Sequence, residues 1–524
     1  MCEYCGKMNR LVATIALLLL PACLFAQSNI YSSWPNFPQN SNFFPLVVWL
    51  QGPTGSLGSN APYPNVAAAM KATKMNVLLA IDGGNSGGGW PSAFGVDCGA
   101  SGNCGQFAAL VQNGIYLIPT VSYTDNTSAN SIASVQAVAT SLNASQYLIG
   151  YNLGDEPWCT QNTAQGPAMS SLGTLIPQLQ TYDSTRPFFL NFTDFVFGHG
   201  ACWPTNNPTN ISALQAISVG SFDVYPVTGP WNGNSNIPVV AGQAQDSMWI
   251  NGWTVAQMVA WGRANQPIWA YVDPGDNELG YPMGNGSVCT QSTNLCTPDN
   301  HEYRATAEQV SAEIWMSLIN GAMGIEYFCH DTSLATGLTS YNFCLGSTTS
   351  GEGAVAAAIA SNLTYVNTTI LSFAPQLNSP VLGRCTMNRN SGVGTGTIPV
   401  YNDFNTSCTN GILTMSTGAA SVPGSAIVKN YNGTAYLFAD SDRNGQATMT
   451  FTLTGYSGAT VTVVYDSNAQ YDPAHSSVGT KFTLDANGRF SDTFGANGHN
   501  YQPKIYSITP GGPAAPTGLT ATVQ

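Results

Sequence analysis

Short apolar runs alternate with longer segments of helical periodicity between residues 44 and 372. Each run is typical of a strand buried on both faces, and each longer segment has the spacing of an amphipathic helix. The predicted strands are 44–51, 76–82, 115–122, 148–156, 187–194, 221–227, 267–273 and 324–330. The predicted helices are 65–75, 104–113, 131–143, 168–182, 211–217, 254–264, 306–321 and 354–372. The pattern therefore predicts eight consecutive units of a strand followed by a helix.

Eight such units form either a closed (β/α)8 TIM barrel or an open, doubly wound sheet. The Gly-rich segment after Asp82, GGNSGGG, lacks the spacing and the following helix of a dinucleotide-binding turn. We therefore expect an α/β fold with a TIM barrel over residues 27–378. The long excursions 228–253 and 274–305 both follow strands, so they would lie at the end of the barrel where barrel enzymes bind substrate.

Beyond residue 378 the helical periodicity gives way to short alternating runs separated by Gly, Asn and Asp. This pattern predicts an all-β sandwich domain over residues 379–508. We expect it to shield the flank of the barrel rather than to bind sugar. Residues 509–524 contain a Pro/Gly linker and a short run that is similar to the first strand of a fibronectin type III module, so the chain is a candidate fragment of a multimodular protein.

Residues 1–26 have the pattern of a secretory signal peptide, with Lys7 and Arg10 ahead of an apolar run that ends at Ala26. That run is shorter than the roughly 20 residues of a membrane-spanning helix. Cleavage near Ala26 would release a secreted protein, extracellular or periplasmic. Acylation at Cys23 is the alternative, although Pro21 fits a lipoprotein signal poorly.

Charged residues make up only 8% of the chain, with 27 acidic side chains against 14 basic ones. The scarcity of Lys and Arg argues against nucleic acid and anionic membranes as partners. Nineteen of the acids fall between residues 82 and 352, whereas Arg186, Arg263 and Arg304 are the cations of that stretch. Most of these carboxylates therefore need an explanation other than ion pairing.

The cysteine count predicts disulfide bonds, because ten of the thirteen cysteines lie outside the leader and ten is an even number. Neighbours in the sequence suggest the pairs Cys98–Cys104, Cys159–Cys202, Cys289–Cys296, Cys329–Cys344 and Cys385–Cys408. Metal binding is disfavoured, since the ten cysteines outside the leader form no Cys-x-x-Cys pair and the five His show no ligand spacing.

Acidic residues stand at four predicted strand ends, where barrel side chains point into a shared mouth: Asp82, Asp155 with Glu156, Asp223 and Asp273. Aromatic residues fall in or beside the same strands: Trp49, Tyr151, Trp158, Tyr225, Trp269, Tyr271 and Tyr327. Aromatic planes stack on the C–H faces of sugars and carboxylates bind their hydroxyls, so the combination suits a neutral carbohydrate substrate and implies no cofactor.

The segment Gly150–Pro157, GYNLGDEP, ends the fourth predicted strand. Over residues 44–375 the chain resembles the glycoside hydrolases of the clan A type, which carry an Asn-Glu-Pro-like motif on strand four and a nucleophilic Glu on strand seven. The resemblance implies that Glu156 is the general acid/base and that Asp155 takes the place of the Asn that contacts the substrate 2-hydroxyl. Repulsion from Asp155 would raise the pKa of Glu156, as a proton donor requires.

The chain departs from that family at two positions. Asp155 replaces the Asn, and strand seven ends in Asp273 instead of Glu, with Glu278 in the following loop. A retaining enzyme needs its carboxyl groups about 5–5.5 Å apart. Asp273 is the expected nucleophile, and Glu278 or an inverting mechanism is the alternative.

The sequence thus predicts a glycoside hydrolase that cleaves β-linked polysaccharide, with a non-catalytic carbohydrate-binding or cell-surface protein on a degenerate barrel as the alternative. Structural explanations compete at single positions: Glu156 as a backbone cap, Asp82 and Asp223 as orienting groups, and the aromatics as core. Glu326 is expected to support the site indirectly. Glu302, Glu308 and Glu313 are expected on a solvated helix face. His330 and Asp331 do not indicate acyl transfer, because no strand is followed by a Gly-x-Ser-x-Gly elbow.

Overall fold

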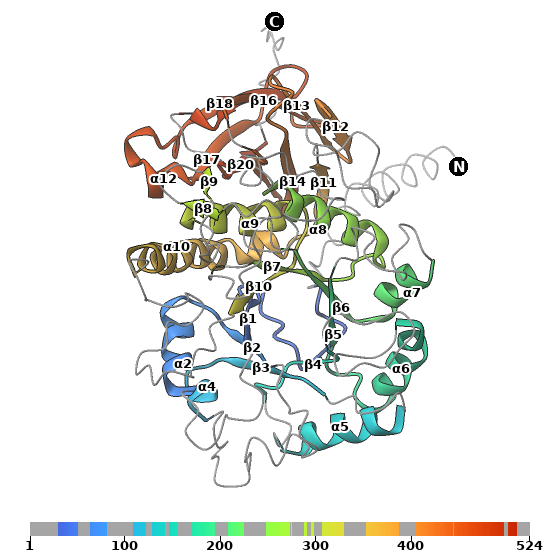
Figure 1. Cartoon of the computed structure of the whole chain (residues 1–524). Helices are drawn as coiled ribbons and strands as arrows, with labels where there is room; N and C mark the ends of the chain where they lie inside the picture. The colour runs from blue at the N-terminus through green and yellow to red at the C-terminus, as the bar shows by residue number, and fades with distance from the viewer. Residues whose placement is uncertain are drawn as a thin grey trace, which may run out of the picture.

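The structure is a computed structural model of the chain. It describes residues 30–50, 63–80, 108–121, 128–141, 146–154, 169–193, 208–224, 248–272, 274, 288–290, 295–297, 306–329, 353–386, 405–443, 445–496 and 501–510. Two parts follow each other along this chain, a parallel barrel and an antiparallel sandwich (Figure 1).

Eight parallel strands form the barrel, in the order β3-β2-β1-β10-β7-β6-β5-β4. They are β1 (Leu46–Leu50), β2 (Val77–Ala80), β3 (Tyr116–Pro119), β4 (Tyr151–Asn152), β5 (Phe188–Thr193), β6 (Val219–Asp223), β7 (Ile268–Val272) and β10 (Gly324–Cys329). Parallel bridges from Leu117 to Leu148 and from Thr120 to Asn152 join β3 to β4 and close the sheet. The predicted TIM barrel is therefore confirmed.

Helices surround the barrel, one after each strand. They are α2 (Tyr63–Ala72), α4 (Ala108–Gln112), α5 (Ser128–Ser141), α6 (Met169–Tyr182), α7 (Pro208–Ala216), α8 (Trp249–Trp261), α9 (Ala307–Ile319) and α10 (Gly353–Ser372), with the short α11 (Ala374–Leu377) at the end. A hairpin of β8 (Val288–Thr290) and β9 (Leu295–Thr297) lies in the excursion after β7, and it pairs Cys289 directly with Cys296.

Two antiparallel sheets form the C-terminal sandwich, as predicted. The six-stranded sheet contains β11 (Val381–Thr386), β14 (Gly424–Tyr431), β15 (Thr434–Ser441), β20 (Lys504–Thr509), β17 (Thr460–Asp466) and β18 (Lys481–Thr483) in spatial order. The four-stranded sheet contains β12 (Ser407–Asn410), β13 (Leu413–Thr417), β16 (Ala447–Leu453) and β19 (Arg489–Phe494). Between β17 and β18 lie α12 (Asn468–Tyr471) and the 3-10 turn η5 (Pro473–His475).

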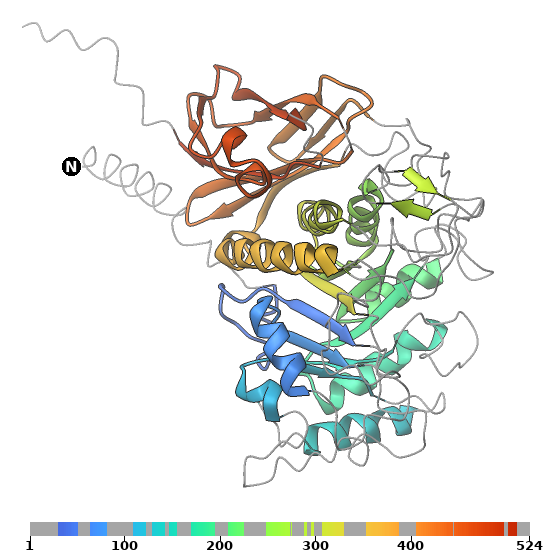
Figure 2. The same cartoon turned by 60° about the vertical axis from the view of Figure 1, so that its left-hand side comes forward.

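The six-stranded sheet packs its outer face on the barrel helices α8, α9 and α11, and Tyr465 of β17 lies near Tyr365 of α10 (Figure 2). Ile427, Phe438 and Ile505 of this sheet belong to the same apolar core as the barrel helices. Trp315 of α9 stacks at a tilt on Tyr465 of β17, with ring centroids 5.2 Å apart. The sandwich therefore covers one flank of the barrel through a continuous hydrophobic contact.

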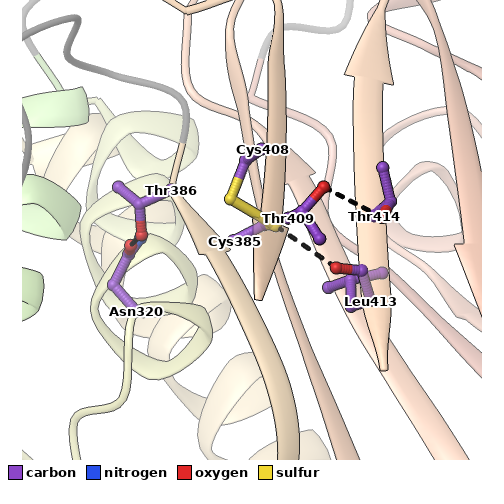
Figure 3. The surroundings of a disulfide bond; sticks show 7 residues. All are labelled: Asn320, Cys385, Thr386, Cys408, Thr409, Leu413 and Thr414. Carbon is purple, nitrogen blue, oxygen red and sulfur yellow. Dashed lines mark hydrogen bonds between the residues drawn. A yellow bond between two sulfur atoms is a disulfide. The ribbon is translucent and has the colours of Figure 1, made fainter. Parts of the chain in front are cut away.

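A disulfide bond between Cys385 of β11 and Cys408 of β12 links the two sheets of the sandwich, with Cα atoms 5.6 Å apart (Figure 3). This predicted pair is confirmed. Beside it, the Thr386 hydroxyl donates to the side-chain oxygen of Asn320, at the end of α9. The side chains of the other eight predicted cysteines lie outside the described residues.

The segment of residues 30–43 closes the barrel at the end where its strands begin. The Trp269 indole N–H donates to the Tyr31 hydroxyl at 2.8 Å, and that hydroxyl donates to the Met323 carbonyl at 2.8 Å. Phe37 stacks on Tyr31 with ring centroids 4.1 Å apart. All three aromatic rings are buried, so this end of the barrel is filled by a packed plug.

Candidate active site

The inward-facing positions near the carboxyl ends of the barrel strands divide into a polar half and an aromatic half. For Thr120, Asn191, Ser221, Tyr271 and Trp49 the direction follows from the alternation along each strand, because the residues two positions earlier belong to the core inside the barrel. Asn152 joins them through its hydrogen bond to Thr120, Asp223 lies two residues after Ser221, and Phe328 packs against that core. Strands β3 to β6 contribute polar residues: Thr120, Asn152, Asn191, Ser221 and Asp223. Strands β7, β10 and β1 contribute aromatic residues: Tyr271, Phe328 and Trp49.

Hydrogen bonds hold the polar half in place. The Asn152 amide donates to the Thr120 hydroxyl at 3.0 Å, and its oxygen accepts the Gly154 N–H at 3.3 Å. The Ser221 hydroxyl donates to the Asn191 oxygen at 3.4 Å. On the aromatic half, Trp49 meets Tyr271 edge to face with centroids 5.3 Å apart, and both rings are buried.

Strand β4 is irregular just before the segment that carries the predicted acid. The bridges to β3 pair Leu117 with Leu148 and Thr120 with Asn152, so β4 has one residue more than β3 between them. Such a bulge redirects the following side chains and occurs often next to active sites. Gly154 then has φ 132, a conformation that favours glycine. Asp155 and Glu156 follow directly, so the bulge and Gly154 determine the direction in which the chain enters the segment that carries these two acids.

Seven predicted site residues lie outside the described residues: Asp82, Asp155, Glu156, Trp158, Tyr225, Asp273 and Glu278. The strands that lead to them are described. Gly154 precedes Asp155, and Val272 precedes Asp273. Because all barrel strands are parallel, these strand ends open at the same end of the barrel.

Glu326 and Asp223 are the two predicted acids inside the described barrel. Glu326 is buried and pairs in register with Tyr271 of β7 and Val47 of β1. Asp223 is half-buried at the last position of β6. Burial raises the pKa of Tyr31 well above its ordinary value, and the negative charge of Glu326 adds to this rise while the hydrogen bond from Trp269 opposes it.

Four expectations about single side chains are wrong. Tyr151 faces away from the barrel interior, because its hydroxyl donates to the Asp183 carboxylate at 2.8 Å. Tyr327 faces away from the barrel interior, because its hydroxyl donates to Asn367 on α10. Trp269 lies at the opposite end from the mouth, where it contacts Tyr31 in the plug. Glu313 is not on a solvated face, since α9 is covered by the sandwich and the side chain is 1% exposed. Parallel strands buried on both faces lack a polar face, which is why the sequence did not reveal the directions of the strand residues.

Sequence reasoning missed four polar residues of the mouth: Thr120, Asn152, Asn191 and Ser221. A signal existed, because each is a polar residue within an otherwise apolar strand run. Within the part of the chain that the structure describes, no group of three or more His, Cys, Asp or Glu is placed to hold a metal ion.

No protein-family model matches the sequence, and no curated protein matches it either. Solved structures resemble the chain at low identity. A protein described as a glycoside hydrolase has a TM-score of 0.46 and 11% identity, covering 89% of this chain and 92% of its own. A glycoside hydrolase family 5 protein from Bacteroides vulgatus has a TM-score of 0.45 and 12% identity, covering 89% of each chain.

A variant of the protein AmyP in complex with maltotriose has a TM-score of 0.47 and 9% identity, covering 93% of this chain and 100% of its own. Similarity at this level of identity and TM-score assigns no function to this chain. The assignment of the barrel and the sandwich rests on the strand order and register described above.

Proposed function

We propose that the protein is a secreted glycoside hydrolase that cleaves β-linked polysaccharide or oligosaccharide by a retaining, two-carboxylate mechanism. One observation carries the proposal. In a closed parallel barrel, strand β4 leads through Leu153 and Gly154 to Asp155–Glu156, and Val272, the last residue of β7, is followed directly by Asp273. The polar and aromatic halves of the interior add groups that bind hydroxyls and stack on sugar rings.

In this mechanism Glu156 donates its proton to the glycosidic oxygen while Asp273 attacks the anomeric carbon. The C–O bond to the leaving sugar breaks, and a covalent ester between Asp273 and the remaining sugar forms. Glu156, now a carboxylate, takes a proton from water, whose oxygen attacks the anomeric carbon and releases Asp273. The enzyme returns to its starting protonation state, and no cofactor takes part.

Hydrolysis is tested by measuring reducing-sugar release from β-glucan, xylan, mannan and starch. We expect wild type to cleave at least one β-linked polymer, and Glu156→Gln to lose at least a thousandfold in kcat. Glu308→Gln, the same change on α9, is the control and should retain activity. If wild type and Glu156→Gln bind the same glycan and neither cleaves any polymer, the non-catalytic alternative is correct.

Aryl glycosides with good leaving groups separate the roles of the carboxylates. Departure of such a group needs little protonation, so Glu156→Gln should retain its first step on them, whereas Asp273→Asn should not. If Glu278→Gln loses the first step on aryl glycosides while Asp273→Asn keeps full activity, the nucleophile is Glu278 instead of Asp273. The anomer formed first, measured by NMR, distinguishes retention from inversion.

Export is tested by expressing the full chain with its leader and determining the N-terminus of the mature protein. Cleavage after Ala26 leaves Gln27 as the first residue. A lipid-modified Cys23 at the N-terminus would instead establish the lipoprotein alternative. Within the described residues no helix is long and apolar enough to cross a membrane.

A further inference from the structure

A cavity of about 570 Å³ lies at the end of the barrel opposite the mouth. It is formed by the segment before β1, the connections that lead into β7, β10 and β11, and Lys429 of the sandwich strand β14. Because strands begin at this end and the predicted catalytic carboxylates follow strand ends, the cavity is separate from the candidate active site. Its volume falls in the range of sites for small molecules.

The described lining of the cavity is positively charged, whereas the chain as a whole is negatively charged. Acidic residues outnumber basic ones 27 to 14 in the sequence, yet among the described residues the lining contains Arg263 and Lys429 and no acidic residue. The remaining lining is uncharged, with amides and hydroxyls such as Gln180, Asn265 and Ser33. A wall of this kind attracts a negative charge and offers hydrogen bonds to a hydroxylated body.

Lys429 is 3% exposed, and its ammonium donates one hydrogen bond, at 2.7 Å, to the Leu377 carbonyl at the end of α11. An ammonium has three donors, and a buried charge is costly unless it is paired. Among the described residues, the charge that acts on it is that of Arg384, which has the same sign, and burial together with this charge lowers the pKa of Lys429 to about 7. A bound anion would supply an opposite charge.

Lys429 also has a structural role, since a cation suits the carbonyl end of a helix. Arg263 has a similar role, because its guanidinium donates to the Ile217 carbonyl at 2.8 Å at the end of α7. Each of these contacts uses one donor of its cation and leaves further donors for a ligand. Trp34, half-buried in the same lining, adds an aromatic surface of the kind on which sugar rings stack.

We propose that this cavity binds an acidic saccharide unit, a sugar carrying a carboxylate such as a uronic acid. Arg263 and Lys429 pair with the carboxylate, the amides and hydroxyls of the lining bind the sugar hydroxyls, and Trp34 contacts the ring. The site would hold an acidic glycan segment on the flank away from catalysis. The proposal does not depend on the proposed hydrolase activity.

Calorimetric titration of the full chain with single sugars tests the proposal. The probes are glucuronate, galacturonate, glucose, acetate and inorganic phosphate. None of them has a glycosidic bond between sugars, so failure of hydrolysis cannot affect the result. We expect at least one uronate to bind at least tenfold more tightly than glucose, acetate and phosphate.

Three variants assign the site. Lys429→Met and Arg263→Gln should each weaken uronate binding at least tenfold, and Trp34→Ala should weaken it several-fold. Lys481→Met and Arg489→Gln remove matching charges from exposed positions of the sandwich and should leave binding unchanged. Circular dichroism checks that each variant is folded, and Arg263→Gln provides the test if Lys429→Met is not.

Several results would overturn the proposal. Equal binding of glucose would remove the role of the charge, and equal binding of acetate or phosphate would show a site for anions in general. Absence of binding for every probe, or equal losses in the control variants, would show that Lys429 and Arg263 serve only as helix caps.

Discussion

Replacement of Gly324 by alanine tests the packed plug of the barrel directly. Gly324 is the first residue of β10, and a Cβ added to it would lie 2.7 Å from Cδ1 and Nε1 of Trp269. Carbon atoms in contact lie about 3.5–4.0 Å apart, so the indole must move by roughly 1 Å. The ring has little room, because Phe189 packs on it with centroids 4.6 Å apart and its N–H bonds to Tyr31.

The expected cost follows from these contacts. Overpacking a dense core costs about 1–3 kcal/mol, and loss of the hydrogen bond between Trp269 and Tyr31 adds about 1 kcal/mol. Replacing glycine restricts the unfolded chain and returns about 0.4–1 kcal/mol. We therefore expect Gly324→Ala to lower the free energy of unfolding by about 2–3 kcal/mol. Gly173→Ala on α6 is the matched control, because no described atom other than those of its chain neighbours and its own helix backbone lies within 4 Å of the Cβ that alanine would add there, and alanine favours the helix.

Urea denaturation followed by tryptophan fluorescence and circular dichroism measures these changes. Trp269→Phe removes part of the ring that the new methyl group would strike, so the double variant with Gly324→Ala should lose at least about 1 kcal/mol less than the sum of the single losses. Additive losses, or a loss below about 0.5 kcal/mol for Gly324→Ala, would refute this account of the plug. A several-fold rise in KM for Trp269→Phe would show instead that the ring contacts substrate.

Three further predictions concern the sandwich and the mouth. The pKa of Lys429 falls from 10.5 to about 7 on folding. The unfolded state therefore binds the proton more tightly, and the free energy of unfolding should rise with pH between these values, by at most about 5 kcal/mol. Denaturation curves measured from pH 6 to pH 10 should show this rise in wild type and not in Lys429→Met. Replacing Cys385 and Cys408 together by serine should cost about 3 kcal/mol, because the bond closes a loop of 23 residues. A reductant also opens the other predicted disulfides, so it should cost wild type about 3 kcal/mol more than it costs the variant. Asn152→Ala frees the Gly154 backbone and should lower kcat by about tenfold to a hundredfold with little change in KM, whereas unchanged kinetics would show that this contact does not position Glu156.

The sequence alone determined the order of elements and the change of architecture near residue 380. The repeating strands and helices predict a barrel because eight parallel strands buried on both faces need eight covering helices. The later alternation predicts the sandwich because its strands have one buried face towards the opposite sheet. The Cys385–Cys408 pair was also evident, since both residues are neighbours among the cysteines of that domain.

Only the tertiary structure decided which side chains share a site. Tyr327 and Glu326 are adjacent in one apolar run, yet one faces α10 and the other the barrel interior. Trp269 became part of a plug because Tyr31, which is 238 residues earlier, folds beneath the barrel. The cavity around Lys429 likewise combines segments that are far apart in the chain. The pattern of apolar and polar residues in a segment indicates whether that segment is a helix or a strand. Contacts between side chains of distant segments depend on how the closed sheet and those segments pack together.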